Sequence, residues 1–260
     1  MKTRSMAAAG SFYPIEKKEL EQELSGYLKG TPKKLAGKLK AIIAPHAGYI
    51  YSGAVAGKAF QLFQQLPRKE WEILLLGPSH TMAFEGASIS LAEQWETPLG
   101  TVPVSKRATK MVSRIIQNIE EAHFQEHDLE VEIPFLQKTL KQFSIIPIVA
   151  GMIDGKVLAI ELENQLKKNT LLVVSSDLSH YLPHKQAVKV DSKTIQAILE
   201  LNTEKIEEIG DACGKIPIIT LLHLAKKKKW KPVLLDYKNS GDTAGDKSRV
   251  VGYAAIAFME

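Results

Sequence analysis

The chain of 260 residues is 45% hydrophobic, and its 34 basic and 29 acidic side chains leave a net charge of +5. This balance is typical of a globular protein with a large core, and the longest apolar runs are too short to span a membrane or to act as a secretory signal. Since Cys213 is the single cysteine, no internal disulfide can form, and we expect a cytoplasmic protein.

Segments with helical spacing of apolar residues alternate with short apolar runs typical of buried strands. Helices are expected at 16–29, 55–66, 105–119, 124–143 with a kink or a late start at Pro134, 157–168, 185–201, 204–209 and 217–229. Strands are expected at 39–44, 72–76, 87–91, 144–149, 171–174, 233–237 and 250–258, and a loop at 95–100. This alternation predicts a single α/β domain over 1–260, with a mostly parallel, mixed central sheet between two helical layers.

The clearest basic run is Lys226 to Lys229, at the end of the last expected helix. Lysines at this position complement the negative end of the helix dipole. No aromatic residues alternate with them, as a surface that stacks on bases would require. We therefore expect neither a nucleic-acid partner nor a membrane partner.

Histidines follow three of the predicted strands within a few residues of their ends: His46, His80, and the pair His180 and His184. The carboxyl ends of parallel strands meet at one edge of a sheet, where open α/β sheets bind their ligands. Histidine is also the commonest metal ligand. Any one of these histidines could instead satisfy a backbone group, but three in the same topological position favour a shared metal site.

Two other residues have the chemistry to act at this edge. Cys213 directly precedes Gly214 and a proline-started helix, whose positive end would favour a thiolate, although a cysteine here could equally be a small buried residue. Asp177 and His180 are three residues apart and could form an acid/base pair, or Asp177 could hold a ligand histidine in one tautomer. The alternative for Asp177 is a helix N-cap.

Further residues are expected around this site rather than in it. His127 lies between two acidic residues, Tyr51 follows the glycine-rich turn after the first buried strand, and Ser79 precedes His80. We expect these three side chains to line the pocket or to support its ligands. His123 and His223 are expected at the surface or in structural roles.

Six segments of the chain, in this order, carry a resemblance to a known family: Ala9–Pro14, Ala44–Gly53, Leu76–His80, Glu126–Asp128 with Glu132–Phe135, Ser175–His180, and Cys213–Pro217. In these segments the chain resembles the Memo family, also called AmmeMemoRadiSam system protein B. That family is related in fold to the class III extradiol dioxygenases, the LigB-like proteins. Together the segments form a specific pattern, and they extend over most of the chain.

The resemblance implies a metal site with His46, His80 and Cys213 as ligands and with Asp177 and His180 beside it for proton transfer. The metal it implies is iron or copper, with zinc possible. The dioxygenase relatives use two histidines and a carboxylate to hold iron, and here Cys213 takes the place of that carboxylate. A soft thiolate favours copper(I), zinc or a thiolate-bound iron, so ring-cleaving activity is not expected.

Three functions follow from these residues. The first is metal-dependent redox chemistry on an unknown small molecule, in a possible enzyme. The second is a binding module that uses the same pocket for a peptide or protein, since the resemblance implies phosphotyrosine-peptide binding and the net charge suits an acidic ligand. The third is metal-free cysteine hydrolysis by Cys213 with His46 or His180. The family name also suggests a pathway link to a radical-SAM protein.

Overall fold

The computed structural model describes residues 2–209 and 211–260. In this part of the chain, nine strands form one mixed sheet in the order β10-β12-β2-β9-β3-β8-β4-β7, with β11 paired to β12. Their bounds are β2 Leu39–Ala44, β3 Trp71–Pro78, β4 Ala87–Ile89, β7 Ile116–Gln117, β8 Phe143–Ala150, β9 Thr170–Ser175, β10 His180–Leu182, β11 Lys231–Asn239 and β12 Val250–Met259. The predicted α/β class with a mixed sheet is confirmed.

The four central strands β2, β9, β3 and β8 run parallel to one another, and β12 and β4 pair antiparallel at the two sides of this group. All eight residues of β3 are buried, as are all six of β9. Strands buried on both faces need apolar residues at successive positions, which is why they appear in the sequence as unbroken apolar runs.

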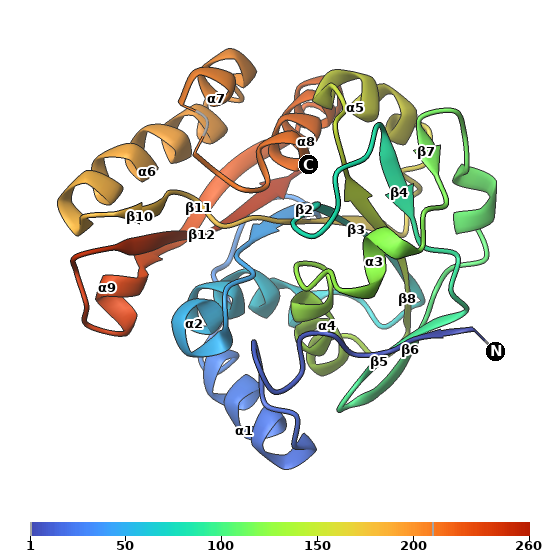
Figure 1. Cartoon of the computed structure of the whole chain (residues 1–260), viewed down its shortest axis with the longest axis horizontal. Coiled ribbons are helices and arrows are strands. Elements are labelled where there is room, and N and C mark those ends of the chain that lie inside the picture. The colour runs from blue at the N-terminus through green and yellow to red at the C-terminus, as the bar shows by residue number, and fades with distance from the viewer. Residues whose placement is uncertain (1, 210) are drawn as a thin grey trace.

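Helices cover both faces of the sheet (Figure 1). One layer contains α1 (Lys17–Tyr27), α2 (Tyr49–Phe60) and α4 (Ile133–Thr139), and the other contains α5 (Gly155–Glu163), α6 (His184–Leu199), α7 (Thr203–Ile209) and α8 (Lys215–Lys228). Successive side chains of a strand point to opposite faces of the sheet. Ile42 therefore packs in the first core, under α1, α2 and α4, and Ile43 packs in the second core, under the other helical layer.

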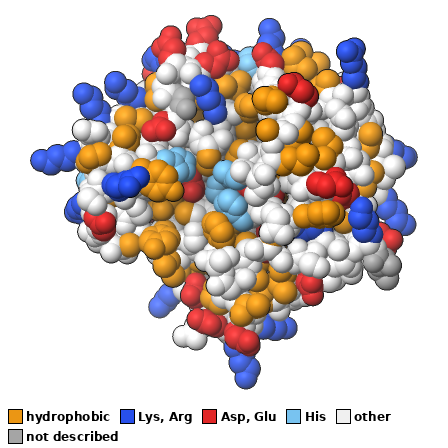
Figure 2. Space-filling model, in the orientation of Figure 1, with side chains coloured by type: hydrophobic (Ala, Val, Ile, Leu, Met, Phe, Trp, Pro, Cys, Tyr) orange, Lys and Arg blue, Asp and Glu red, His pale blue; other side chains and the backbone are white. Residues whose placement is uncertain are grey.

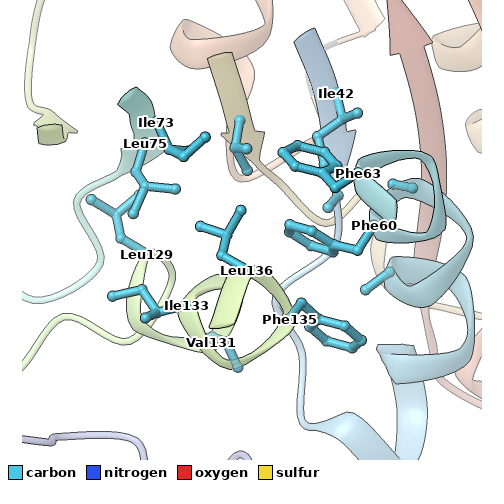
Figure 3. Packing of buried hydrophobic residues seen from close by; sticks show 14 of the residues in the cluster. Ile42, Phe60, Phe63, Ile73, Leu75, Leu129, Val131, Ile133, Phe135 and Leu136 are labelled. Atoms are coloured by element: carbon cyan, nitrogen blue, oxygen red, sulfur yellow. The ribbon is translucent and has the colours of Figure 1, made fainter. Parts of the chain in front are cut away.

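The first core is rich in aromatic side chains (Figure 3). The ring of Phe60, from α2, stacks on that of Phe135, from α4, with centroids 5.0 Å apart, in the same core as the strand residue Ile42. Gly53 and Gly57, both in α2, let this helix approach Tyr27 at the end of α1 closely. A Cβ at Gly57 would lie 2.4 Å from the backbone oxygen of Tyr27, whereas one at Gly26 would meet nothing within 4 Å.

Two of the predicted elements are wrong. Residues 95–100, expected as a loop, lie largely in an antiparallel pair of strands, β5 (Gln94–Thr97) and β6 (Gly100–Pro103), and β5 also pairs with β1 (Thr3–Arg4). Residues 105–119, expected as a helix, contain only the 3-10 turn η2 (Ala108–Met111) and the strand β7. The apolar spacing there is satisfied by a turn and a strand that both point into the second core, so the period alone did not identify a helix.

The segment 124–143 is also more broken than expected. It contains the end of α3 (Glu121–Phe124), a loop, the 3-10 turn η3 (Glu130–Glu132) and α4, whose second residue is Pro134. The late start at the proline is therefore confirmed, and the preceding residues are free to form a loop. The remaining helical elements are η1 (Gln61–Gln65) and α9 (Ser240–Thr243). None of the helices in the described residues has the length and apolar character needed to cross a membrane.

Candidate metal centre

Two of the predicted ligands lie at the carboxyl edge of the sheet, as expected from their positions in the sequence. His46 follows β2 after Pro45, and His80 follows β3. The strand β9 separates β2 from β3, so both histidines come from the centre of the sheet. Their ring centroids are 5.2 Å apart. His46 is buried, while the side chain of His80 is 30% exposed and faces the solvent side of the site.

The structure adds His127 to this pair. Its ring centroid lies 5.4 Å from that of His46 and 4.8 Å from that of His80. One nitrogen from each of the three rings lies within 4.8 Å of the other two, so the cluster could hold a metal ion. The sequence placed His127 beside the site, because the loop that carries it follows no strand of the predicted sheet. The ring of Phe12 stacks on His127 at 4.2 Å and limits its movement.

Hydrogen bonds at Nδ1 orient these imidazoles. The Nδ1 atom of His46 lies 2.9 Å from the hydroxyl of Ser175, which is itself 2.8 Å from the carboxylate of Glu132. The Nδ1 atoms of His80 and His127 lie 2.8 and 3.3 Å from the same carboxylate oxygen of Glu126. When Nδ1 donates its proton to such a partner, Nε2 keeps its lone pair for a metal ion.

Glu126 orients two of the three histidine rings, those of His80 and His127. Its carboxylate is buried and also accepts the backbone N–H groups of His80, at 2.6 Å, and of His127, at 3.1 Å. Burial opposes its ionisation, but hydrogen bonds from His127 and His80 outweigh this cost and hold the pKa of Glu126 well below its usual range. The carboxylate is therefore charged at neutral pH and can orient both rings.

His46 is in the form that binds metals. Burial, and then the neighbouring His80 and His127, lower its pKa well below the usual value for a histidine. Its imidazole is thus neutral at physiological pH, with no proton to be displaced from Nε2 when Nδ1 is the donor. Three closely spaced imidazoles would repel one another if protonated, so the cluster is suited to a cation.

Cys213 lies next to this cluster. Its Sγ is 3.3 Å from Nε2 of His46 and accepts the backbone N–H of Asp177 at 3.2 Å. Burial, and then the nearby Asp177 carboxylate, raise the pKa of the thiol, which is the opposite of the shift expected from the end of the helix α8. Without a cation the thiol therefore stays protonated, and a metal ion would have to displace its proton.

Asp177 is buried behind His46. One of its oxygens accepts the backbone N–H of His46 at 2.9 Å. Burial raises the pKa of Asp177 to about 7, although the N–H groups of His46 and Ala47 stabilise its charged form. The alternative that Asp177 caps a helix is wrong, because the next element is the strand β10. The acid can exchange a proton near neutral pH.

The other predicted residues have different surroundings. His180 lies in β10 with its ring 6.0 Å from that of Tyr181, outside the cluster of ligand atoms, and His184 bonds Asp242 at 2.9 Å. Ser79 donates to the carbonyl of Met82, and Tyr51, in the first turn of α2, is 39% exposed.

His123 is fully buried, so the surface alternative for it is wrong. One of its ring nitrogens lies 3.0 Å from the Ser88 hydroxyl, and its backbone carbonyl accepts a hydrogen bond from Arg4. The guanidinium of Arg4 in turn pairs with the buried carboxylate of Glu130. His123 therefore has a structural role at the base of the loop that carries His127.

A hollow of about 400 Å³ opens beside the cluster. Its lining includes His80, Cys213 and four apolar residues: Met82, Phe84, Met152 and Ile216. Figure 2 shows histidine side chains near the centre of this face, with hydrophobic side chains around them. The hollow is large enough for a small molecule next to the predicted ligands.

Two further acids, Asp128 and Glu132, are buried next to the site. Among the described residues, Asp128 Oδ2 and Glu132 Oε2 have no hydrogen-bond partner. Burial raises the pKa of both carboxyls, so both can carry a proton. A Cβ at Gly77 would lie 1.7 Å from Asp128 Oδ2, which shows that only glycine at the end of β3 leaves room for this acid. Sequence reasoning missed Glu132 and Ser175 as support for the histidines, although both lie in the segments that carry the family resemblance.

The fold and the site together define an α/β protein with a histidine cluster at the carboxyl edge of a mixed sheet. A family model described as "Memo-like protein" matches residues 4–257. A "MEMO1 family protein" of Aquifex aeolicus is 38% identical, with all of both chains covered, and one of Methanosarcina acetivorans is 37% identical over 98% of this chain and 99% of its own. The chain belongs to the Memo family.

A solved structure supports the fold independently. It is an uncharacterized protein of Escherichia coli K12, named JW3007, with a TM-score of 0.57, 11% identity, and coverage of 84% of this chain and 99% of that one. This match fits the relationship to a LigB-like fold that the sequence resemblance implied. At this identity it concerns the fold alone.

Proposed function

We propose that this Memo-family protein is a metal-dependent redox protein that acts on a small molecule in the hollow beside His80 and Cys213. The observation that supports it best is the arrangement of His46, His80 and His127, each with Nδ1 near a hydrogen-bond partner and with one nitrogen within 4.8 Å of the others. Imidazoles ordered in this way are typical of metal ligands.

His46 and His80 belong to both possible sets of three ligands. The third ligand in our proposal is Cys213, whose Sγ lies 3.3 Å from His46 Nε2, and the alternative third ligand is His127. A thiolate in the set favours copper(I), zinc or a thiolate-bound iron. Bound iron or copper would supply one-electron oxidation and reduction, and zinc would not.

Other residues of the chain would handle the substrate and its protons. Asp177, with a pKa raised to about 7 by burial, can store or release a proton beside Cys213, and its backbone N–H holds the sulfur in place. We assign the second proton-transfer role to His180. The apolar residues Met82, Met152 and Ile216 of the hollow would favour a small molecule with an apolar part and would keep water away from it.

The test is the metal content of protein purified without a histidine tag. Iron, copper and zinc are measured per chain in the wild type and in the variants Cys213→Ser, His127→Gln and His223→Gln, the last as a control away from the cluster. We expect stoichiometric metal in the wild type and the control, and a loss in Cys213→Ser. A loss in His127→Gln alone would replace Cys213 by His127 as the third ligand. Metal-free wild-type protein that takes up no added metal would refute the proposal.

A metal-free cysteine hydrolase is the second candidate. The distance of 3.3 Å between Cys213 Sγ and His46 Nε2 favours it, because a cysteine nucleophile and a histidine base must lie in contact with each other. The raised pKa of Cys213 and the lowered pKa of His46 oppose it, since both groups are then neutral and no thiolate forms. Iodoacetamide separates the two candidates. A hydrolase thiolate would be alkylated rapidly at neutral pH in metal-free protein, and we expect slow alkylation.

A further inference from the structure

A second cavity, of about 610 Å³, lies at the edge of the sheet opposite to the histidines. Its walls include the first residues of the parallel strands β2, β3 and β9, namely Leu39, Trp71 and Thr170 with Leu171. His46 follows the other end of β2, so the strand of six residues, roughly 20 Å long, separates the two sites. No residue of this cavity contributes to the metal centre.

The interior of this cavity is apolar. Leu39, Trp71 and Leu171 are nearly inaccessible to solvent and pack at the base of the first core, and Leu62 and Leu66 close the side formed by the end of η1. Met259, at the end of β12, adds another apolar side chain to the lining. The volume of the cavity lies in the range of small-molecule sites, which also have mostly apolar walls and a few polar groups.

The lining also carries five lysines: Lys33, Lys38, Lys40, Lys69 and Lys168. The one acidic side chain in the lining, Glu260, pairs with Lys40 at 3.0 Å. The ammonium of Lys69 lies 3.9 Å from the ring centroid of Trp71, and that of Lys33 donates to the carbonyl of Leu234. Within residues 2–209 and 211–260, neither Lys38 nor Lys168 takes part in an ion pair.

These two properties together specify a ligand. We propose that the cavity binds an amphipathic anion: an alkyl chain that lies against Leu39, Trp71 and Leu171, with a carboxylate or phosphate head group between Lys38 and Lys168. A neutral apolar molecule would leave the excess of ammonium groups without partners, and a small inorganic anion would leave the apolar walls exposed to water. Lysines provide charge without a fixed geometry, so they accept both head groups.

The expected affinities follow from the exposure of the two lysines. Exposed ion pairs are weak, so the variant Lys38→Gln/Lys168→Gln should bind the anion only about tenfold more weakly. Removal of the head-group charge should have a similar effect, and higher salt should weaken binding of the anion alone. Filling the cavity, with Leu66→Trp at its half-buried wall, should abolish binding.

The experiment is a calorimetric titration with dodecanoate, dodecyl phosphate, dodecanol and dodecylammonium, each below the concentration at which it forms micelles. The control variant Lys226→Gln/Lys227→Gln removes the same charge from the exposed end of α8, outside the cavity. A further variant, His80→Ala, changes the metal centre and should leave binding unaltered. Thermal unfolding of each variant shows that it is folded.

Several results decide the proposal. The proposal is supported if either anion binds and if its binding is weakened by the cavity lysine variant but not by the α8 variant. The anion that binds more tightly identifies the head group. Equal binding of dodecanol, or equal losses in both lysine variants, would overturn it. So would the absence of binding by every probe, or binding that Leu66→Trp leaves intact and His80→Ala removes.

Discussion

The variant Glu126→Gln tests whether one buried carboxylate organises the metal centre. In the wild type, one oxygen of Glu126 is within 3.3 Å of Nδ1 in both His80 and His127, and the other accepts the His80 backbone N–H at 2.6 Å. Glutamine has the same shape but a single acceptor oxygen. Its amide NH₂ must therefore face either the two ring nitrogens or the backbone N–H.

Both orientations weaken the site. If the NH₂ group faces the rings, Nδ1 becomes an acceptor and the proton moves to Nε2, which then has no lone pair for a metal ion. If it faces the backbone N–H of His80, two donors oppose each other in a buried place, at a cost of about 1–3 kcal/mol in the free energy of unfolding. Loss of such a supporting partner lowers metal affinity about 10- to 100-fold, or roughly 1.4–2.7 kcal/mol.

The assay is a titration of metal-free protein with zinc in competition with a chromophoric chelator, because zinc adds no redox reaction. The control is Glu121→Gln, which removes the same charge from the exposed first turn of α3. We expect weaker binding only in Glu126→Gln. Zinc affinity within twofold of the wild type, in a Glu126→Gln protein whose circular dichroism shows that it is folded, would refute this reasoning.

Three other changes probe the fold around the site by urea unfolding. Gly57→Ala should destabilise the protein by more than about 2 kcal/mol, because its Cβ would meet a backbone oxygen at 2.4 Å. Gly26→Ala adds its Cβ in open space and should stabilise the protein by up to about 1 kcal/mol. Equal effects of the two variants would contradict the packing of α1 on α2. Burial lowers the pKa of His123 to about 4, against about 6.5 in the unfolded chain, so the unfolded state binds the extra proton and stability falls as the pH drops from about 6.5 towards 4. Between pH 7.5 and 4.5 this loss should be about 2.5 kcal/mol and should be missing from His123→Gln, and the same pH dependence in both proteins would exclude a buried neutral histidine. Arg4→Met leaves the buried carboxylate of Glu130 without its partner and should lower the free energy of unfolding by about 3–5 kcal/mol. Lys205→Met removes an exposed ion pair with Glu200 and should lower it by less than about 1 kcal/mol. Similar losses in the two variants would show that the Arg4 pair is not effectively buried.

Much of the fold could be predicted because its signals are local. The strands at 39–44, 72–76, 144–149 and 171–174 are unbroken apolar runs, and each appears in the structure with bounds shifted by no more than two residues. The position of His46 and His80 after two of these strands was enough to place both at the carboxyl edge. Where local spacing had two solutions, as at 105–119, the outcome was set by pairing with β4, which lies far away in the sequence.

The details of the site depended on the tertiary structure. His127 and Glu126 lie in a loop between α3 and η3 that follows no strand of the sheet, and no periodic pattern shows that this loop reaches the carboxyl edge. The protonation of Cys213 was also decided there, because burial, and then the carboxylate of Asp177, raise the pKa of its thiol. The sequence by itself determined the α/β architecture, the edge of the sheet and two of its histidines. The third imidazole, the carboxylate that orients it and the protonation of His46, Glu126 and Cys213 follow from burial and from contacts between distant segments, which only the folded chain defines.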